Sequence, residues 1–387
     1  MHPSFHRLMP VARRPELVMS RGDGSYLWDD RGQRYLDFIQ GWAVNSLGHA
    51  PPELASALSA QSARLLTPSP AFYTAPLLDL AERLVRSSRL HQVQLCSTGA
   101  EANECAIKLM RKWGKRHKGG AWQIITTRNA FHGRTLAAMA ASGKPGWDTL
   151  FPPVVPGFIK VPFGDAAAIE RHLSPDVAGI LVEPIQGEAG VVLPPAGYLQ
   201  QLRELSLAHD VLLACDEVQT GVGRTGTLFC HETSQIVPDI LTLGKGLGGG
   251  VPIAATLASA RASCFEPGDH GSTYGGNPLV CAAALAVFEL VSQPEFLANV
   301  RRRGEQLLEG LERLARQHGG QARGRGLLAA WQLESPRASA VADACRDRGL
   351  LINAAQPDTL RFMPSLRVTA GEIEAMLGLL DAGFVRA

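Results

Sequence analysis

Five apolar runs rich in β-branched and aliphatic residues alternate along the chain with stretches of helical periodicity. The runs span residues 92–96, 123–127, 177–183, 211–215 and 240–243. Such alternation is typical of βαβ units, in which parallel strands are covered by helices on both faces. A helical stripe between the first two runs consists of Ala102, Cys105, Ala106, Leu109, Met110 and Trp113. We therefore expect an α/β fold with a mainly parallel sheet sandwiched by helices.

The pattern changes after Pro278. Long helical stretches over 279–291 and 297–317 are followed by short apolar runs at 327–333 and 360–363. Thr369 and Glu372 form a capping box that predicts the start of a last helix. Because 387 residues suit a large domain with a smaller partner, we divide the chain into three parts. These are an N-terminal segment (1–50) that contributes to the small domain, a large domain (51–292) and a C-terminal small α+β domain (293–387).

Composition argues against several classes of partner. The 38 basic and 36 acidic residues leave a formal net charge of +2, so no electrostatic footprint for nucleic acid or an anionic membrane is present. The longest apolar run, 279–288, is too short to span a bilayer, and residues 1–21 do not resemble a signal peptide. Seven cysteines without a C-x-x-C pair indicate reduced thiols. We expect a cytoplasmic protein that binds neither nucleic acid nor membrane.

Lys245 stands in an unusual place for a solubilising charge. It follows the apolar run 240–243 and lies within the glycine tract 244–250, whose backbone can approach a ligand closely. A second apolar run ends in Asp216. An amine and a carboxylate, each at the carboxyl end of a strand, meet the needs of an aldehyde cofactor with a ring nitrogen.

The segment 97–104 is predicted to pass from a strand through a small-residue turn into a helix. Thr98 and Glu101 form a capping box, and Gly99 with Ala100 would leave free N–H groups at the helix N-terminus. Such a terminus attracts phosphate, although on its own the segment is more typical of a simple well-capped helix. Together with Lys245 and Asp216, the phosphate interpretation is favoured.

Other chemistries find less support. Two matches to G-x-G-x-x-G, at 221–226 and 244–249, lack the strand and helix context of a dinucleotide site, and no G-x-S-x-G elbow is present. The histidines are scattered, so we expect no metal site, and His132 is interpreted as a polar loop residue. The nearby Phe131 and Arg134 can supply a ring face and a carboxylate clamp. The combined set matches pyridoxal 5′-phosphate.

Several blocks of sequence resemble a known family. They are STGAEANE (97–104), FHGRT (131–135), EPIQGEAGV (183–191), DEVQTGVGRTG (216–226), LGKGLGGGVP (243–252) and GSTYGGNPL (271–279). The chain resembles the class III pyridoxal-phosphate aminotransferases of fold type I from about Arg21 to its end, and within them the acetylornithine aminotransferases. The separation of 29 positions between Asp216 and Lys245 (245 minus 216) is specific for the class.

The resemblance implies a cofactor site. Lys245 would form a Schiff base with the aldehyde, Asp216 would pair with the pyridine nitrogen, and Phe131 would stack on the ring. Gln219 would lie on the side of the 3-hydroxyl group. Thr273 of the partner subunit would reach the phosphate, so a homodimer with shared sites is implied. The implied cofactor-binding residues are Thr98, Gly99, Ala100, Phe131, Asp216, Glu217, Val218, Gln219, Lys245 and Thr273.

The resemblance also implies a substrate site made of Arg134, Glu188, Ser272 and Arg361. Arg134 would bind the α-carboxylate of the amino donor, and Ser272 would lie near the bound amino acid. Glu188 would pair with Arg361 while the donor is bound and release it for a carboxylate of 2-oxoglutarate. Gly41 would leave room for an acylated amine, whereas Trp42 could change the wall of the pocket.

The implied reaction moves the ω-amino group of N-acetylornithine to 2-oxoglutarate by a ping-pong mechanism in arginine biosynthesis. Lys245 would serve as the general base and acid. Ornithine, succinylornithine and 4-aminobutyrate stay open as donors. An aminomutase of the same fold, and a nucleotide-binding protein that uses the glycine loops, are the alternatives from other classes.

Overall fold

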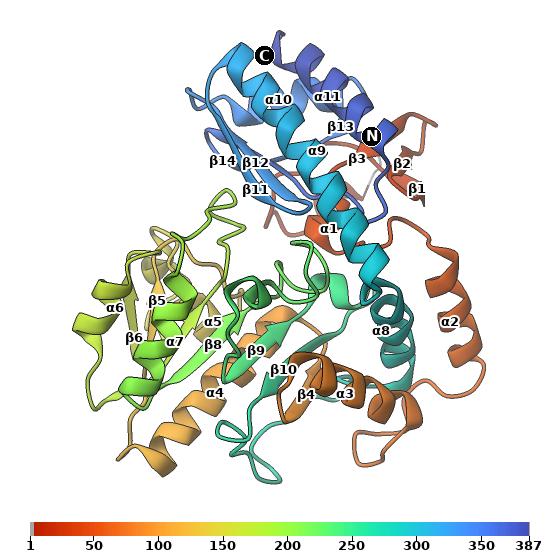
Figure 1. The fold of residues 1–387 in the computed structure, drawn as a ribbon. Helices are drawn as coiled ribbons and strands as arrows, with labels where there is room; N and C mark the ends of the chain where they lie inside the picture. The colour runs from red at the N-terminus through yellow and green to blue at the C-terminus, as the bar shows by residue number, and fades with distance from the viewer. Residues whose placement is uncertain (1–3, 387) are drawn as a thin grey trace.

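The computed structural model describes residues 4–386, and a seven-stranded sheet forms its centre (Figure 1). The strand order is β4-β10-β9-β8-β7-β5-β6. Neighbouring strands from β9 to β6 are parallel, whereas β10 is antiparallel to both β4 and β9. The strands are β4 (Gln92–Cys96), β5 (Gln123–Thr127), β6 (Phe158–Val161), β7 (Val177–Val182), β8 (Leu212–Asp216), β9 (Ile240–Leu243) and β10 (Ala254–Ala258).

The predicted α/β fold is confirmed, and all five predicted strands are present in it. Strands β7, β8, β9 and β10 are buried along their whole length, as expected for strands covered on both faces. The sequence did not predict β6 or β10. The residues of β10, AATLA, have low intrinsic strand propensity, and their conformation depends on pairing with two neighbouring strands.

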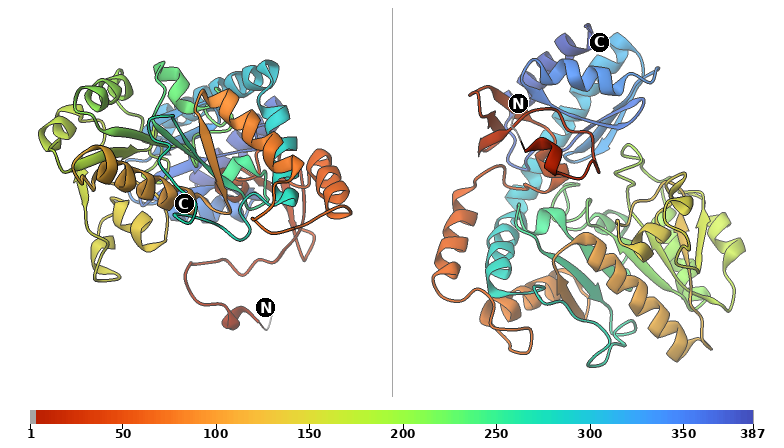
Figure 2. Two further views of the ribbon diagram at one scale, coloured as in Figure 1. Left: turned by 90° about the horizontal axis from the view of Figure 1, so that it is seen from below. Right: turned by 180° about the vertical axis from the view of Figure 1, so that it is seen from behind.

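Helices cover both faces of this sheet. Helix α4 (Gly99–His117) crosses one face, while α6 (Ala166–His172) and α7 (Tyr198–Ala208) lie over the other (Figure 2, left). Near the β4 edge, α2 (Pro52–Ser62), α3 (Ala75–Ser88) and α8 (Pro278–Val291) pack together. The apolar stripe predicted on α4 is buried, because it faces the sheet.

The C-terminal part contains a second sheet, of order β11-β12-β15-β14. Its strands are β11 (Gln321–Arg325), β12 (Leu328–Gln332), β14 (Asn353–Gln356) and β15 (Thr359–Phe362). The accompanying helices are α9 (Pro294–His318), α10 (Ala338–Arg346) and α11 (Ala370–Phe384). The capping box predicted at Thr369 and Glu372 is confirmed.

The N-terminal strands lie beside the C-terminal part, as the red and blue elements of Figure 1 show. Strands β1 (Met19–Asp23), β2 (Tyr26–Asp29) and β3 (Arg34–Asp37) form a sheet with β13 (Leu350–Leu351), in which β3 and β13 are parallel. The boundaries proposed at residues 50 and 292 stay a prediction.

A short segment after β3, α1 (Gln40–Ala43), has an unusual backbone. All four of its residues have φ between 49° and 64°, which is the left-handed region. A run of left-handed residues that includes non-glycine positions is unfavourable, so surrounding contacts must stabilise it. The carboxylate of Asp37 accepts the amides of Ile39 and Gln40, and the Ser46 hydroxyl just beyond the segment donates to the Gly246 carbonyl. The segment therefore lies against the loop of Lys245.

Within residues 4–386, no helix taken alone is long and apolar enough to cross a membrane. Helices α8 and α9 are long and apolar enough only when they are counted together, and the bend between them is 71°.

The seven cysteines are buried and free.

Candidate active site

The carboxyl ends of the parallel strands, and the loops that follow them, surround a cavity of about 300 Å³. Open α/β sheets bind ligands at this edge. The lining residues are Thr98, Gly99, Ala100, Asn103, Phe131, His132, Gly133, Arg134, Glu183, Glu188, Asp216, Val218, Gln219 and Lys245. The fold thus brings together residues that are up to 147 positions apart (245 minus 98).

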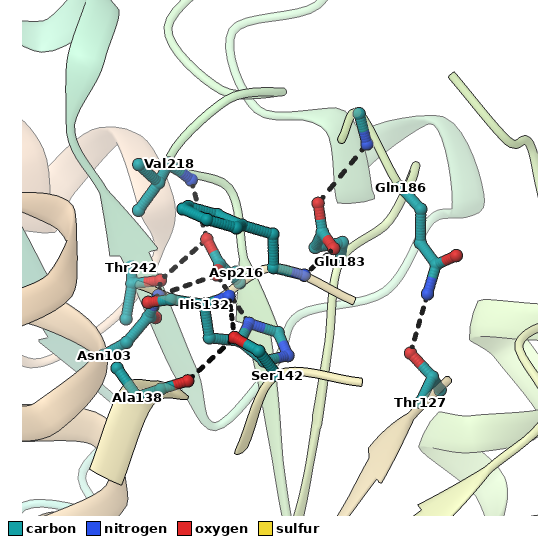
Figure 3. A network of polar contacts seen from close by, with 12 residues as sticks. Asn103, Thr127, His132, Ala138, Ser142, Glu183, Gln186, Asp216, Val218 and Thr242 are labelled. Atoms are coloured by element: carbon teal, nitrogen blue, oxygen red, sulfur yellow. Dashed lines mark hydrogen bonds and ion pairs between the residues drawn. The ribbon is translucent and has the colours of Figure 1, made fainter. Parts of the chain in front are cut away.

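Asp216, the last residue of β8, is held by four neighbours (Figure 3). Its Oδ2 lies 2.7 Å from Asn103 Nδ2 and 2.7 Å from His132 Nδ1. Its Oδ1 accepts from the Val218 amide at 3.0 Å and from the Thr242 hydroxyl at 3.4 Å. The side chain is 3% exposed. Asp216 therefore presents a buried carboxylate of fixed orientation at the edge of the cavity.

Lys245 follows β9 and starts the short 3₁₀ helix η4 (Lys245–Leu247). Its φ is 41°, a left-handed conformation that is uncommon for a residue with a side chain and that surrounding contacts must stabilise. Burial lowers the pKa of the Lys245 amine, and the neighbouring Glu188 carboxylate opposes this shift. The amine lines the cavity, and it is therefore more easily deprotonated than an ordinary lysine.

The N-terminus of α4 opens directly into the cavity. The capping box is confirmed: Thr98 Oγ1 accepts the Glu101 amide, and Glu101 Oε2 accepts the Thr98 amide at 2.7 Å. The amides of Gly99 and Ala100 donate to no acceptor within residues 4–386. A Cβ at residue 99 would lie 2.5 Å from the Val218 side chain, so this close approach requires glycine. Two free N–H groups and a helix dipole form a ready site for an anion.

Phe131 borders the cavity in the loop after β5. Its amide donates to Glu183 Oε1 at 2.9 Å, and Glu183 Oε2 accepts the Gly187 amide at 3.3 Å. Burial raises the pKa of the Glu183 carboxyl to about 7. Glu183 thus connects the loop of Phe131 with the loop of Glu188.

Glu188 and Gln219, which line the cavity, both contact Arg361, which is not itself a lining residue in the described part of the chain. Arg361, on β15, donates from Nη1 to Glu188 Oε1 at 2.8 Å and to Gln219 Oε1 at 3.2 Å, while Asn353 accepts from its other nitrogens. Burial by itself raises the pKa of the Glu188 carboxyl, but Arg361 and Lys245 outweigh this effect and bring it to about 2. The second sheet therefore contributes a buried guanidinium, 1% exposed, to the site.

Arg134 is exposed at the mouth of the cavity. Its guanidinium lies 4.4 Å from the ring centroid of Trp147 and 5.8 Å from that of Phe131. Both distances are within the range of a cation–π contact. Two arginines, Arg134 and Arg361, thus approach the cavity from different elements.

Three predicted site residues lie elsewhere. The Glu217 carboxylate accepts the amides of Cys230 and His231 at 2.5 and 2.8 Å, so it stabilises η3 (Cys230–Ser234), and Glu217 is not among the residues that line the cavity. Its predicted cofactor contact stays a prediction. Ser272 and Thr273 lie in a loop that borders a separate surface hollow with Phe72 and Tyr73.

Trp42 is 53% exposed on the left-handed segment, next to Gly41. Neither residue lines the cavity in the described part of the chain.

Sequence reasoning missed some residues that shape the site. Asn103 is a polar residue on the buried stripe of α4, which is a usable signal because a buried amide requires partners. His132, interpreted as a polar loop residue, does lie in a loop, but it is buried and its Nδ1 contacts Asp216, a contact that the sequence did not predict. Glu183 was noted only as part of a motif. Lys144, whose Nζ lies 3.7 Å from Glu188 Oε2, has no local signal at all.

Comparison with known proteins gives a consistent result. Residues 9–383 match the class-III aminotransferase family. Among curated relatives, acetylornithine aminotransferase 2 of Bordetella bronchiseptica is 48% identical, covering 97% of this chain and 96% of its own length. The acetylornithine aminotransferase of Ralstonia nicotianae is 49% identical, with 96% of each chain covered.

Among solved structures, the ornithine aminotransferase of Toxoplasma gondii superposes with a TM-score of 0.94 at 34% identity, covering 99% of this chain and 93% of the other. The N-acetylornithine aminotransferase of Stenotrophomonas maltophilia gives 0.85 at 39% identity, with 96% of each chain covered. The resemblance read from the motifs is confirmed. The chain belongs to the class-III aminotransferases, which are enzymes dependent on pyridoxal phosphate.

Proposed function

We propose that this enzyme transfers the ω-amino group of N-acetylornithine to 2-oxoglutarate, in arginine biosynthesis. The observation that carries the proposal is the 48–49% identity, over nearly the whole chain, to relatives named acetylornithine aminotransferases. The arrangement of Glu188 and Arg361 supports it, since a guanidinium covered by a carboxylate can be freed for a second carboxylate.

The residues present fit pyridoxal phosphate. The free amides of Gly99 and Ala100 would hold the phosphate, aided by the dipole of α4. Asp216 offers a buried carboxylate for the ring nitrogen, and Phe131 borders the same cavity. Val218 and Gln219 also line it. Lys245 supplies the amine that an aldehyde needs.

When bound, the cofactor supplies an electron sink for the negative charge that develops on the donor carbon. The chain's own contribution is proton transfer and positioning. The Lys245 amine, whose pKa is lowered by burial, would take a proton from the donor carbon and return it to a neighbouring atom. The Asp216 carboxylate would keep the ring nitrogen protonated by Coulombic attraction.

Two arginines would bind substrate carboxylates. Arg134 would hold the α-carboxylate of the donor at the mouth of the cavity. During the donor half-reaction Arg361 would stay paired with Glu188, and during the acceptor half-reaction it would bind 2-oxoglutarate. One site could then accept a monocarboxylate and a dicarboxylate in turn.

The enzyme is proposed to act as a homodimer with shared sites. In support, large apolar residues near the Ser272–Thr273 loop are exposed: Phe72 by 65%, Tyr73 by 84% and Tyr274 by 66%. Exposed apolar patches of this kind favour a protein interface. Thr273 would then reach the phosphate in the partner's cavity, and Ser272 would lie near the substrate. Light scattering at micromolar concentration checks the dimer; a monomer with full activity would exclude shared sites.

We also propose a cytoplasmic location, because the seven cysteines are free and buried, as is typical of a reducing compartment. No nucleic-acid or membrane partner is proposed, because the net charge is only +2.

A second donor is favoured by one observation. The solved structure with a TM-score of 0.94 is an ornithine aminotransferase. Ornithine differs from N-acetylornithine in its free α-amino group, so the two donors can be compared directly.

One assay tests the proposal. The holoenzyme is supplied with N-acetylornithine, ornithine, succinylornithine or 4-aminobutyrate, each with 2-oxoglutarate, and glutamate formation is followed. We expect the highest kcat/KM with N-acetylornithine and ping-pong dependence on 2-oxoglutarate. A higher kcat/KM for ornithine would assign that donor instead, and turnover without any oxo-acid would indicate an aminomutase.

A further inference from the structure

Glu188 lies within 4 Å of two cations, and the proposed function uses only one of them. Lys245 also attracts the Glu188 carboxylate, but from beyond 4 Å, and the proposed function assigns its amine to the cofactor aldehyde. Its Oε1 lies 2.8 Å from Arg361 Nη1, while its Oε2 lies 3.7 Å from Lys144 Nζ. Within residues 4–386 no other cationic side chain approaches the Glu188 carboxylate within 4 Å. The carboxylate therefore lies between two positive groups on different elements.

The backbone next to Lys144 is held tightly against the loop of Phe131. The Gly143 amide donates to the Ala130 carbonyl at 3.0 Å, and the Asn129 amide donates to the Gly143 carbonyl at 2.9 Å. A Cβ at residue 143 would lie 2.2 Å from the Thr127 carbonyl oxygen, so only glycine allows this approach. Lys144 thus starts from a backbone position that is fixed relative to the cavity.

The Lys144 ammonium lies among aromatic rings. Its Nζ is 5.1 Å from the ring centroid of Phe131 and 5.5 Å from that of Trp147. Both rings present favourable surroundings for a cation. Only 24% of the side chain is exposed, and burial lowers the pKa of its amine while Glu188 opposes that shift. This lysine is a partly buried neighbour of Phe131 and Glu188, which line the cavity, and it is not a freely solvated surface charge.

The proposed function creates a need for such a cation. When a dicarboxylate acceptor takes Arg361, Glu188 loses its closest counter-charge. The Glu188 side chain is only 22% exposed, and a carboxylate left without a partner in such a place is strongly disfavoured. Gln219 remains beside it but is neutral.

We propose that the Lys144 ammonium becomes the main ion-pair partner of the Glu188 carboxylate when a second carboxylate binds Arg361. Lys144 thereby determines the affinity of the site for the dicarboxylate acceptor. Lys144 acts through Glu188 and is a positioning residue. This inference rests on the proposed function. A Glu188 side chain shared by two cations can change its main partner without ever losing a counter-charge.

The test uses the holoenzyme, with glutarate as an unreactive dicarboxylate probe. The variants are Lys144→Met, which removes the charge, and Lys144→Arg, which keeps it. Lys118→Met is the matched control, because Lys118 is also partly buried but donates to the His209 carbonyl away from the cavity. Calorimetry gives the dissociation constant of glutarate, and single-turnover absorbance measures each half-reaction separately.

We expect Lys144→Met to weaken glutarate binding by about tenfold and to lower kcat/KM of the acceptor half-reaction to a similar extent. The donor half-reaction should change by less than about twofold, because Glu188 and Arg361 stay paired in it. Lys144→Arg and Lys118→Met should match the wild type in glutarate affinity. In a Glu188→Gln background, Lys144→Met should lose most of its effect, since the side chain that it positions is then neutral.

Other outcomes overturn the inference. A slower donor half-reaction with unchanged glutarate affinity would mean that Lys144 binds the donor directly. Wild-type rates of the Lys144→Met variant in both half-reactions, with wild-type glutarate affinity, would show that Lys144 has no role in acceptor binding. An error in the proposed function can be distinguished from an error in the role of Lys144. If the proposed function is wrong, the wild-type enzyme itself fails to turn over N-acetylornithine with 2-oxoglutarate.

Discussion

Two carboxylates at the active site are held in contrasting ways. Asp216 accepts hydrogen bonds from four directed partners, which include Asn103 of α4 and Thr242 of β9, and its side chain is 3% exposed. Glu188 lies on a loop, is 22% exposed and faces the cations Arg361 and Lys144. A carboxylate that must stay in place is best held by several directed hydrogen bonds, whereas one that must move is best held by charges that can exchange partners. Substitutions at four residues, taken from the largest expected effect to the smallest, test whether the two carboxylates differ in this way.

The largest effect is expected at Lys245, which lines the same cavity as the two carboxylates. Replacing it with alanine removes the proposed Schiff-base amine and proton carrier, so kcat should fall by at least about 10³-fold. Turnover is measured together with borohydride trapping and mass spectrometry of the labelled peptide. Lys118→Ala serves as the control. Unchanged turnover and visible absorbance in Lys245→Ala would refute the assignment.

Asp216→Asn tests the rigid carboxylate. The substitution keeps the size but removes the charge proposed to hold the ring nitrogen protonated, so kcat should fall by about 10²- to 10³-fold. The control is Asp239→Asn, because Asp239 is also a buried carboxylate, paired with Arg203 at 2.7 Å away from the cavity. If the control lost as much activity, the effect would be one of folding and not of charge at the ring.

Arg361→Lys tests the exchangeable carboxylate. Lysine keeps the positive charge but lacks the several N–H donors by which the guanidinium contacts Glu188, Gln219 and Asn353. The KM for 2-oxoglutarate should therefore rise by about tenfold or more. The donor half-reaction should be less affected. Arg301→Lys, whose parent side chain donates to the Gly226 carbonyl, is the control. Equal losses in both half-reactions would contradict a separate role in acceptor binding.

The smallest effect concerns stability and Glu183, the link between the two loops. Its pKa is about 7 in the folded protein against 4.5 for an ordinary glutamate, because burial disfavours the charged form. The raised pKa contributes stability that is complete below pH 4.5 and is lost as the pH rises through 7. The wild type should therefore lose up to ~3 kcal/mol relative to Glu183→Gln between about pH 5 and pH 8.

Urea unfolding of both proteins at these two pH values measures the difference. The absolute stability of Glu183→Gln should be lower at pH 5, because an amide has one oxygen for the amides of Phe131 and Gly187. A difference between the two proteins that does not vary with pH would show that Glu183 does not titrate in this range.

Much of the fold was predictable because its signals are local. Strands β4, β5 and β9 have the predicted bounds, since each is a short apolar run between turn residues. The capping boxes at Thr98 and Thr369 were predictable for the same reason, as each depends on two residues three positions apart. The alanine-rich β10 was missed, because its conformation comes from strands on either side.

The site residues also divide into those that local sequence predicts and those that only packing brings together. Local pattern was enough to predict the strand-end positions of Lys245 and Asp216 and the helix N-terminus at Gly99, because each depends on residues that are close together in the chain. Tertiary packing brings Asn103 and His132, which lie 113 and 84 positions from Asp216, to its carboxylate, and it directs the Glu217 carboxylate toward η3. It also decided that Glu188 lies between Arg361 and Lys144. Such contacts depend on how the loops and the two sheets pack together, and pairs that meet only through packing leave no mark in local sequence.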